Sequence, residues 1–322
     1  MKPLFLDDLL DSESFAIGVD VGGTKTRAVA FSAHGVLGSM KVPTERGPDG
    51  VVATVRQVVT ALCDPEAGRL TGVLRAVGVG IPGVVDSQAG TVSHGVNVGI
   101  LGENVPLGKR LAAELNIPVT LVNDTDAATL GAARTTGSGD DVALLSVGTG
   151  LAAGFILDGV PRKGASGSAG EIGHMVYREN GLPCACGQRG CLEVYASGRA
   201  LDRLWPGAQA GHSGEELFAA ADSGAPEAVE ARDQWIRALA HAVTMTALSV
   251  DPAAIVLGGG VSELGPQLLE HLREELTARA SHSPFLEHAN VAGRISLVPP
   301  GAEIAALGAC LAALRPHNIQ AH

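Results

Sequence analysis

Aromatic residues are scarce in this chain: two Trp, two Tyr and six Phe make up 3% of its 322 residues. Proteins that bind single-stranded nucleic acid stack the bases on aromatic side chains, and this composition offers too few for that role. Basic residues are also in the minority, because 23 Lys and Arg stand against 34 Asp and Glu, which leaves a net charge of −11. A surface of this charge repels nucleic acid and anionic membranes on average. We therefore expect no nucleic-acid partner and no membrane partner.

Long hydrophobic runs are missing as well. The longest uncharged stretch, residues 142–157, is shorter than the roughly 20 residues that a membrane-spanning helix needs. It contains several glycines and predicts two buried strands joined by a turn. Near the N-terminus, Asp7, Asp8, Asp11 and Glu13 interrupt any apolar run before it reaches the length of a signal peptide. The expectation is a cytoplasmic protein.

The remaining composition is that of a globular protein with enough length for two domains. Hydrophobic residues make up 46% of the chain and charged residues 18%, and a domain averages about 150 residues. Strands and helices alternate along the sequence, which is typical of an α/β fold with largely parallel sheets. The expected strands are 15–21, 26–31, 74–81, 119–122, 142–147, 151–157 and 254–257, and the expected helices are 49–63, 107–115, 126–134, 226–248, 266–280 and 303–314.

Two turns are rich in glycine and threonine. The first, Asp20-Val21-Gly22-Gly23-Thr24-Lys25, places a carboxylate at the end of a strand and two glycines in the turn that follows. Without side chains, glycines allow backbone N–H groups to approach an anion such as a phosphate. The second turn, Gly148-Thr149-Gly150, echoes the first and suggests two halves built on one plan. An ordinary hairpin turn is the alternative, and the chain contains no G-x-x-x-x-G-K-[ST] phosphate-binding motif.

Two further glycine clusters need separate interpretations. The segment Gly78-Val79-Gly80-Ile81-Pro82-Gly83 matches the dinucleotide-binding pattern G-x-G-x-x-G. That pattern must open a helix, whereas Pro82 and the residues after it predict a turn between extended segments, so we expect no nucleotide there. Gly258-Gly259-Gly260 follows a buried strand, and ligands of open α/β sheets collect at such carboxyl ends. A simple loop explains this second cluster equally well.

Asn123 and Asp124 lie where an expected strand gives way to an expected helix. The helix dipole favours an ionised carboxylate at this position. Such a carboxylate could accept a hydrogen bond from a substrate hydroxyl and take its proton as the oxygen attacks phosphorus. The alternative is a plain N-cap of the helix.

One segment carries metal-binding chemistry. Three of the five cysteines are Cys184, Cys186 and Cys191, and His174 precedes them. One imidazole nitrogen and three thiolates are enough to close a tetrahedral Zn²⁺ site, and with no open position that zinc is structural. Three buried cysteines or a strained C-x-C disulfide are the alternatives.

The same metal would bring two distant acids together. Glu171 and Glu193 lie just outside the metal-binding segment, so a clamp at His174 and Cys191 would hold them near each other. Carboxylates and an imidazole in fixed directions suit hydroxyl-rich ligands. Solvated surface charges are the alternative interpretation of these two glutamates.

Taken together, these motifs resemble those of sugar kinases of the ROK family (repressor, open reading frame, kinase). The resemblance covers nearly everything from Phe15 to Leu314, and the order and spacing of the motifs are more specific than any one of them. The matching segments are DVGGTK at 20–25, GIPG at 80–83, ND at 123–124, GTG at 148–150, GEIGH at 170–174, CACGQRGCLE at 184–193, YASGRAL at 195–201 and LGGGVS at 257–262.

The resemblance implies an actin-like, ribonuclease-H-like ATPase fold of class α/β, with two domains around a cleft. The smaller domain would comprise residues 1–122 together with 302–322, whose helix returns to pack on it. The larger domain would comprise residues 123–301 and carry the zinc-binding segment.

The resemblance also implies roles for individual residues. ATP phosphates would be held by Gly22, Gly23, Thr24, Lys25, Gly148, Thr149 and Gly150, with Asp20 near Mg²⁺ and Gly258, Gly259 and Gly260 beside the adenosine. Asp124 would be the catalytic base toward the C6 hydroxyl of the sugar. The other hydroxyls would be bound by Asn97, Asn123, Glu171, His174 and Glu193. His174 would use one ring nitrogen for zinc and the other for sugar.

The expected activity is therefore ATP-dependent phosphorylation of the 6-hydroxyl of D-glucose or N-acetyl-D-glucosamine, by an enzyme that forms a homo-oligomer. ROK glucokinases usually carry an aromatic residue shortly after the asparagine that matches Asn97, whereas this chain continues Val98-Gly99-Ile100. A smaller wall leaves room for an N-acetyl group on the sugar.

Two alternatives stay open. One is a kinase for another hexose, such as N-acetylmannosamine or fructose. The other is a non-catalytic, sugar-responsive ROK regulator that acts through a partner. ROK repressors add a DNA-binding helix-turn-helix at the N-terminus, and the roughly 14 residues before the first strand, four of them acidic, are too few for that module.

Overall fold

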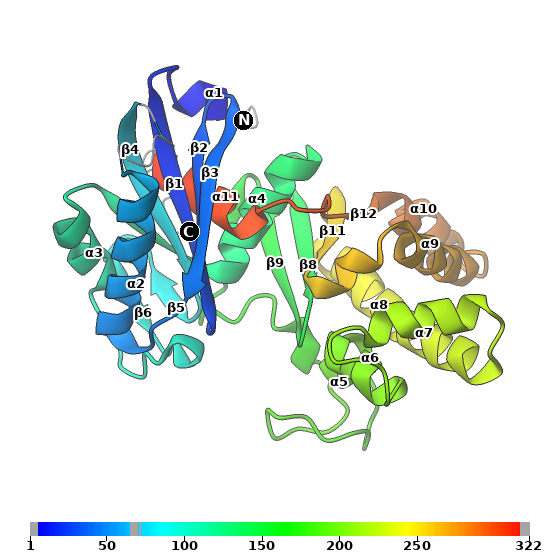
Figure 1. The fold of residues 1–322 in the computed structure, drawn as a ribbon. Coiled ribbons are helices and arrows are strands. Elements are labelled where there is room, and N and C mark those ends of the chain that lie inside the picture. Colours follow the sequence, from blue (N-terminus) through cyan, green and yellow to red (C-terminus); the bar gives the residue numbers. More distant parts are fainter. Residues whose placement is uncertain (1–5, 65–69, 71, 316–322) are drawn as a thin grey trace. The chain divides into compact units, whose positions relative to one another are not determined.

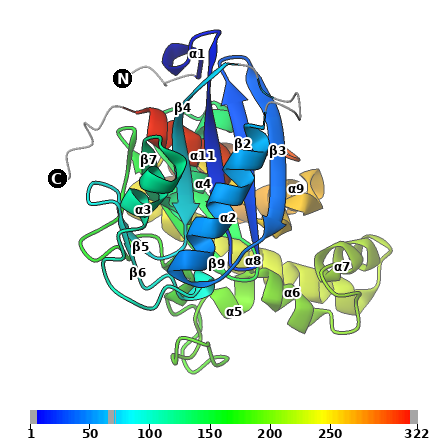
Figure 2. The same ribbon diagram turned by 60° about the vertical axis from the view of Figure 1, so that its left-hand side comes forward.

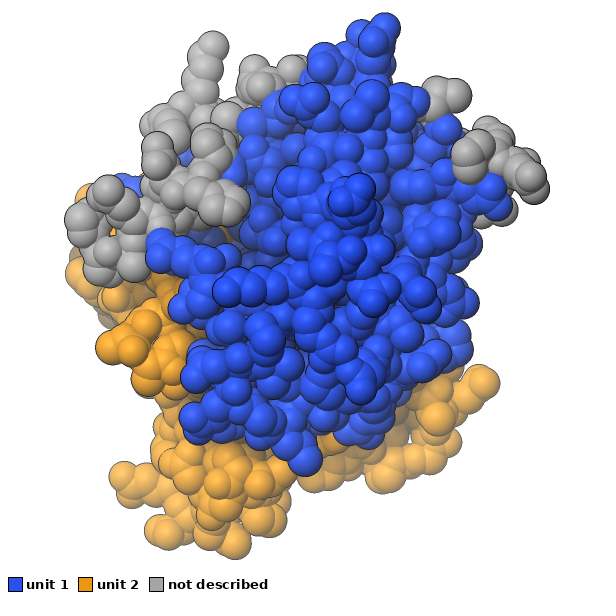
Figure 3. Space-filling model, turned by 90° about the vertical axis from the view of Figure 1, so that its left-hand side faces the viewer, with its two compact units in different colours: residues 1–140, 158–161, 301–322 blue, residues 141–157, 162–300 orange. Residues whose placement is uncertain are grey.

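The computed structural model describes residues 6–64, 70 and 72–315. By their contacts, these residues form two compact units. Unit 1 contains residues 1–140, 158–161 and 301–322, and unit 2 contains residues 141–157 and 162–300; Figure 3 shows them in two colours. The chain therefore changes unit after residue 140, while the domain boundary expected at residues 122 and 123 stays a prediction.

The sheet of unit 1 has the strand order β3-β2-β1-β4-β7. The first three strands form antiparallel pairs, and β1 pairs with β4 and β4 with β7 in parallel. The sheet is therefore mixed, and the expected parallel arrangement holds only from β1 to β7. The strands are β1 (Ser14–Val21), β2 (Lys25–Ser32), β3 (Gly35–Pro43), β4 (Val73–Ile81) and β7 (Val119–Asn123).

The alternation of side chains along β1 assigns its two faces. Ile17, Val19 and Val21 are buried in the cluster that includes α2 (Gly47–Leu62) and α3 (Leu107–Leu115). Ala16 packs with residues of α11 (Ile304–Leu314) on the other face. Figure 2 shows α2 and α3 on the side of the sheet opposite α4 (Asp124–Thr136) and α11.

Glycines let α11 approach the sheet and α4 at backbone distance. A Cβ added to Gly18 of β1 would lie 1.7 Å from the carbonyl oxygen of Ala306, and one added to Gly78 of β4 would lie 1.8 Å from that of Ala309. Gly308 of α11 is equally close to the Ala127 oxygen of α4. No larger residue fits at these positions, so the small side chains hold the last helix against the first sheet.

Unit 1 also contains three smaller elements and a turn of 3-10 helix. These are α1 (Leu6–Leu9), the antiparallel pair β5 (Val84–Asp86) and β6 (Thr91–Ser93), and η2 (Val96–Val98). The segment 78–83 forms the end of β4 and a turn into β5, with no helix after it. The expectation that its glycine pattern does not open a helix is thus confirmed.

The second sheet has the order β10-β9-β8-β11-β12. As in unit 1, a hairpin is followed by two strands in parallel: β8 and β9 are antiparallel, and β8, β11 and β12 are parallel. This shared order agrees with two halves built on one plan. The strands are β8 (Val142–Val147), β9 (Leu151–Leu157), β10 (Val160–Pro161), β11 (Ala254–Gly258) and β12 (Ile295–Leu297).

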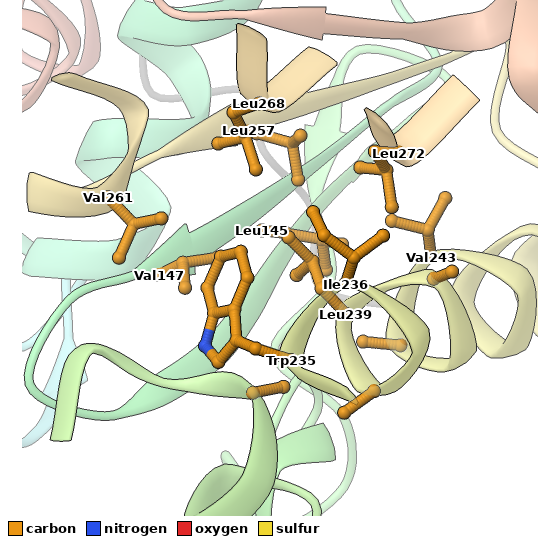
Figure 4. Close-up of a cluster of buried hydrophobic side chains, with 14 of the residues drawn as sticks. Leu145, Val147, Trp235, Ile236, Leu239, Val243, Leu257, Val261, Leu268 and Leu272 are labelled. Atoms are coloured by element: carbon orange, nitrogen blue, oxygen red, sulfur yellow. The ribbon is translucent and has the colours of Figure 1, made fainter. Parts of the chain in front are cut away.

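Helices cover strands β8, β9, β11 and β12 of unit 2 and close its core. Trp235 of the long helix α8 is fully buried among Leu145, Val147, Leu257 and Leu268 (Figure 4). Its indole N–H donates to the carbonyl oxygen of Ser197 at 3.1 Å, so its polar atom is satisfied. The helices are α5 (Glu193–Ala196), α6 (Gly198–Leu204), α7 (Ser213–Asp222), α8 (Pro226–Val250), α9 (Pro266–Ala280) and α10 (Pro284–Ala289) (Figure 1). Three turns of 3-10 helix accompany them: η3 (Ile172–His174) before α5, η4 (Gly260–Leu264) before α9 and η5 (Val291–Arg294) after α10.

Candidate active site and metal cluster

The first glycine-rich turn connects β1 to β2 in unit 1. The Gly22 N–H donates to the Lys25 carbonyl at 3.0 Å, and the Thr44 hydroxyl donates to the Gly22 carbonyl at 2.8 Å. A Cβ on Gly22 would lie 2.9 Å from the Lys25 oxygen, and a Cβ on Gly23 would lie 2.9 Å from the Asn97 oxygen. Both positions therefore require glycine for steric reasons. Thr24 is exposed, as an anion-binding turn requires.

Asp20 lies at the end of β1, just before this turn. Burial is the main cause that raises its pKa to about 6, and the nearby carboxylates of Asp124 and Glu303 raise it further. Arg27, its direct partner across the β1–β2 pair, lowers the pKa. Asp20 is thus a largely buried acid whose charge interacts with that of Asp124.

Asn123 and Asp124 mark the change from β7 to α4. Asn123 is the N-cap of α4: its side-chain oxygen accepts from the N–H groups of Thr125 at 2.9 Å and Asp126 at 3.2 Å. Its side-chain nitrogen donates to the Gly83 carbonyl at 3.1 Å. The capping role is therefore present, and the amide keeps one N–H for a ligand.

Asp124 is the first residue of α4. One of its carboxylate oxygens accepts from the Thr125 N–H at 2.8 Å. Burial is the largest influence and raises its pKa above the ordinary value, while the hydrogen bonds from Thr125 and Asn123 act against it. A carboxylate in this setting is oriented by the helix end and retains the lone pairs that a proton acceptor uses.

Asn97 lies in η2, packed against the first turn. Its carbonyl oxygen is the atom that faces Gly23, and its side chain is exposed. The neighbouring Val96 carbonyl accepts from the Arg46 guanidinium at 3.1 Å. Unit 1 thus brings together Asp20, the glycine-rich turn, Asn97, Asn123 and Asp124.

In unit 2, Gly148-Thr149-Gly150 connects β8 to β9. The Gly148 carbonyl accepts from the Gly198 N–H at 2.7 Å. The Glu193 carboxylate accepts from the Leu151 N–H at 3.1 Å, and a Cβ on Gly150 would lie 2.4 Å from the same carboxylate oxygen. Glu193 therefore touches this turn directly.

The third glycine cluster meets the end of the same sheet. Gly258 pairs with Ser146 in the β11–β8 register. Gly259 has φ +82°, and a Cβ there would lie 2.5 Å from the Val147 oxygen. Gly259 thus needs glycine for both its conformation and its packing, and it lies beside the residue that precedes Gly148.

The metal-binding side chains converge in unit 2. The candidate ligand atoms of His174, Cys184, Cys186 and Cys191 all lie within 4.8 Å of one another. The sulfurs of Cys186 and Cys191 are 3.6 Å apart, and Cys184 Sγ is 3.8 Å from His174 Nδ1. A tetrahedral zinc site with Zn–S bonds of about 2.3 Å has edges of about 3.8 Å, so the four side chains fit this ion.

Two further observations suit a metal at this cluster. Hydrogen bonds from Gln188 lower the pKa of the Cys186 thiol to about 6, which favours the thiolate that binds metal, whereas burial raises the pKa of the Cys191 thiol to about 12. A bound cation would favour loss of the proton from Cys191. All five cysteines of the chain are free thiols, so the C-x-C disulfide is wrong. Because Nδ1 of His174 faces the sulfurs, its Nε2 faces the other way and lies 3.8 Å from the Glu171 carboxylate.

Within unit 2, the structure therefore gathers Glu171, His174 and Glu193 around the metal cluster and the second turn. A Cβ on Gly173 would lie 2.1 Å from the Leu151 oxygen and 3.3 Å from Cβ of Glu193. The segment from Glu171 to His174 thus packs against the start of β9 and the Glu193 stem. The expectation that Glu171 and Glu193 lie near each other stays a prediction.

Sequence reasoning missed two residues near Asp20. Arg27 and Glu303 form an ion pair at 2.7 Å. A signal for Arg27 was available, because a tight turn from Gly22 to Thr24 fixes the hairpin register and places residue 27 opposite residue 20. Glu303 is distant in sequence and could be found only from the packing of α11.

Comparison with known proteins decides the family, because residues 16–314 match the ROK family. The chain belongs to the ROK family. A glucokinase of Streptomyces coelicolor is 34% identical over 279 residues, which are 80% of this chain and 86% of that one. An N-acetylmannosamine kinase of Escherichia coli O127:H6 is 28% identical over 249 residues, 76% of this chain and 82% of that one.

The fold of this ROK chain also matches a solved structure. The crystal structure of a ROK family glucokinase from Streptomyces griseus in complex with glucose and AMPPNP has a TM-score of 0.70 at 30% identity, over 93% of this chain and 99% of that one. The predicted α/β, actin-like fold class is thereby confirmed. Among the helices of the described residues, none combines the length and the apolar composition that crossing a membrane requires.

Proposed function

We propose that this ROK protein is a hexokinase that transfers the γ-phosphoryl group of ATP to the 6-hydroxyl of D-glucose or N-acetyl-D-glucosamine. The observation that carries the proposal is the position of Asp124, a largely buried carboxylate at a helix start, in the same unit as Asp20, Asn97 and the first turn. The family relationship to glucokinases supports the reaction type.

In the proposed reaction, Asp124 accepts the proton of the sugar O6 as that oxygen attacks the γ-phosphorus. The O6–phosphorus bond forms, the bond from the γ-phosphorus to the bridging oxygen breaks, and ADP leaves. Within unit 1, Asn97 and Asn123 offer amide groups to other sugar hydroxyls. Within unit 2, Glu171, His174 and Glu193 offer carboxylate and imidazole groups to sugar hydroxyls. These side chains orient O6 toward the phosphorus, which is the main requirement of such a transfer.

In unit 1, the turn from Gly22 to Lys25 offers backbone N–H groups to the ATP phosphates. In unit 2, the turn from Gly148 to Gly150 offers N–H groups of the same kind, and Gly258 to Gly260 would lie beside the adenosine. Asp20 would hold Mg²⁺, which would offset the phosphate charge; one or two carboxylates with phosphate oxygens are a usual set for this ion. His174 and the three cysteines would hold a structural zinc ion, which would stabilise the loop that carries Glu171 and Glu193.

The region after Asn97 bears on the choice of sugar. Val98 and Ile100 are fully buried, and Gly99 adopts φ +78°, where a Cβ would lie 2.8 Å from the Gly47 nitrogen. No aromatic side chain follows Asn97 in η2, and this supports space for a 2-acetamido group.

An ADP-release assay over glucose, N-acetylglucosamine, N-acetylmannosamine and fructose tests the function and the sugar together. We expect ADP formation with glucose or N-acetylglucosamine and a much lower rate without sugar. Sugar binding detected by calorimetry, with no ADP released from any member of the panel, would indicate a non-catalytic regulator and refute the proposal.

A further inference from the structure

Arg27 lies in β2, two residues after the first glycine-rich turn. It pairs directly with Asp20 in the antiparallel register of β1 and β2. Direct cross-strand partners project from the same face of a sheet, with Cβ atoms about 5 Å apart. That face is the one on which α4 and α11 pack, because Gly18, two residues before Asp20, meets Ala306 of α11.

Glu303 holds the guanidinium of Arg27 on this face. The ion pair measures 2.7 Å, and Glu303 is the N-cap residue of α11, whose position is set by the glycine contacts with the sheet. The Nε atom of Arg27 is buried and has no hydrogen-bond partner among the residues that the structure describes. Burying a guanidinium atom unpaired costs free energy, so stability alone does not account for an arginine here.

The charged groups around Asp20 can be counted element by element. β2 brings Arg27, α4 brings Asp124, the start of α11 brings Glu303, and β4 brings the uncharged Gly80. When ionised, three carboxylates and one guanidinium carry a formal charge of −2, since −3 plus 1 is −2. Without Arg27 the three carboxylates would carry −3 beside the place proposed for an anionic triphosphate, where Lys25 and a bound Mg²⁺ would also supply positive charge.

We propose that Arg27 is a positioning residue for the nucleotide: it offsets negative charge beside Asp20 and so allows the phosphate-binding end of unit 1 to bind a nucleoside triphosphate. This inference rests on the proposed function and names a residue that acts for the same site through Asp20. Arg27 compensates one of the three carboxylates, and Glu303 keeps it on the face of the sheet where Asp20 lies.

The test is a set of three charge variants with binding, not turnover, as the readout. Isothermal calorimetry measures the Kd of the ATP analogue AMPPNP in the presence of Mg²⁺ at pH 8. Arg27→Met keeps an unbranched side chain but makes the local charge −3, and we expect binding to weaken roughly tenfold. Glu303→Gln makes the local charge −1, and we expect binding to tighten by about threefold to tenfold.

The double variant checks the charge count, whereas Glu303→Gln separates charge from structure. Arg27→Met with Glu303→Gln restores the formal charge of −2 while it abolishes the ion pair, and we expect AMPPNP affinity within about threefold of the wild type. The differences among variants should shrink in 1 M NaCl, because salt screens charge but not steric damage. A purely structural role of the ion pair predicts weaker binding in both single variants, with the double variant no worse than either, because removing both partners leaves no unpaired charge. Weaker binding of AMPPNP by Glu303→Gln would therefore overturn the inference.

A matched control uses an exposed ion pair of the same unit. Arg56 and Glu114 lie 3.7 Å apart on the surface, so Arg56→Met should leave AMPPNP affinity unchanged. If Arg27→Met does not fold, the AMPPNP affinity of Glu303→Gln alone tests the inference, because structural damage would weaken binding and not tighten it. Binding of AMPPNP by the wild type with equal affinity in all variants refutes the role of Arg27, whereas a wild type that binds no AMPPNP refutes the proposed function itself.

Discussion

Single side chains show a conflict between stability and function, most clearly at Asp20. Its pKa is about 6 in the folded chain and about 3.9 in an unfolded one. The folded chain therefore binds this proton more tightly, so this group's contribution to stability is full below about pH 4 and is lost as the pH rises through 6. Keeping Asp20 ionised at pH 8 costs on the order of 3 kcal/mol, at 1.36 kcal/mol per pKa unit.

We therefore predict that Asp20→Asn raises the melting temperature at pH 8 by several degrees, with a much smaller change near pH 4, and abolishes most activity. Calorimetry at both pH values measures this difference. Asp49→Asn is the matched control, because the Asp49 side chain is 93% exposed. Equal melting temperatures of Asp20→Asn and the wild type at pH 8 would contradict the prediction.

The second side-chain prediction concerns Asp124. Asn at this position keeps an oxygen that can accept from the Thr125 N–H but cannot take a proton. We expect Asp124→Asn to lower kcat by roughly 10²- to 10⁴-fold with sugar affinity little changed. Burial raises the pKa of Asp124, so kcat/KM of the wild type should fall on the acid side at a higher pH than an ordinary aspartate would give. Near-normal turnover of the variant would remove Asp124 from the role of base.

Among the helices, α11 gives the sharpest prediction. Replacing a glycine inside a helix by alanine usually stabilises a protein by about 0.5–1 kcal/mol. At Gly308 the added Cβ would lie 1.7 Å from the Ala127 oxygen, so the sign should reverse. We expect Gly308→Ala to lower the free energy of unfolding by about 3 kcal/mol or more, measured by urea denaturation. Gly102→Ala is the control, because its Cβ would meet only Val105 at 3.6 Å, and equal losses in both variants would refute the close-packing argument.

The metal-binding loop, which carries His174, Cys184, Cys186 and Cys191, gives another testable prediction. Cys184→Ser removes one of four ligands, and we expect loss of bound zinc, measured by elemental analysis, and loss of most activity, since the loop also carries Glu193. Cys63→Ser is matched in chemistry but lies outside the cluster, so its zinc content should equal that of the wild type. A metal-free, fully active Cys184→Ser chain would show that the loop folds without the ion.

The same elements show how far sequence alone could go. The strands of both hairpins and the helices at 107–115 and 266–280 were predictable, because apolar periodicity and local glycine or proline mark their ends. Strand β3 was missed, since its half-exposed pattern buries little and offers no apolar run. Short helices such as α6 and α10 were missed for the same reason.

The residues of the candidate site also fall into two groups, those that the sequence could indicate and those that only the folded structure reveals. The metal ligands and the pair Asn123 and Asp124 are local in sequence, so spacing and position indicated them. The ion pair of Arg27 with Glu303 depends on where α11 packs, which no local pattern encodes. The pKa of Asp20 likewise depends on burial and on carboxylates from distant segments.

For the complete chain, the two units differ in what stabilises them. The largest buried cluster, around Trp235, lies in unit 2, and a separate cluster around Ile17 and Leu121 lies in unit 1. The zinc ligands are all in unit 2, whereas Gly308 and its contacts are all in unit 1. Two units with separate cores need not unfold in one step.

We therefore predict two calorimetric transitions with separate sensitivities. A zinc chelator should lower one melting temperature and leave the other unchanged, because metal binding stabilises only the unit that holds the ligands. Gly308→Ala should lower the other one, and the two perturbations together should act additively. A single transition that both perturbations lower would mean that the units unfold cooperatively, and the loss of either core would then destabilise the whole site.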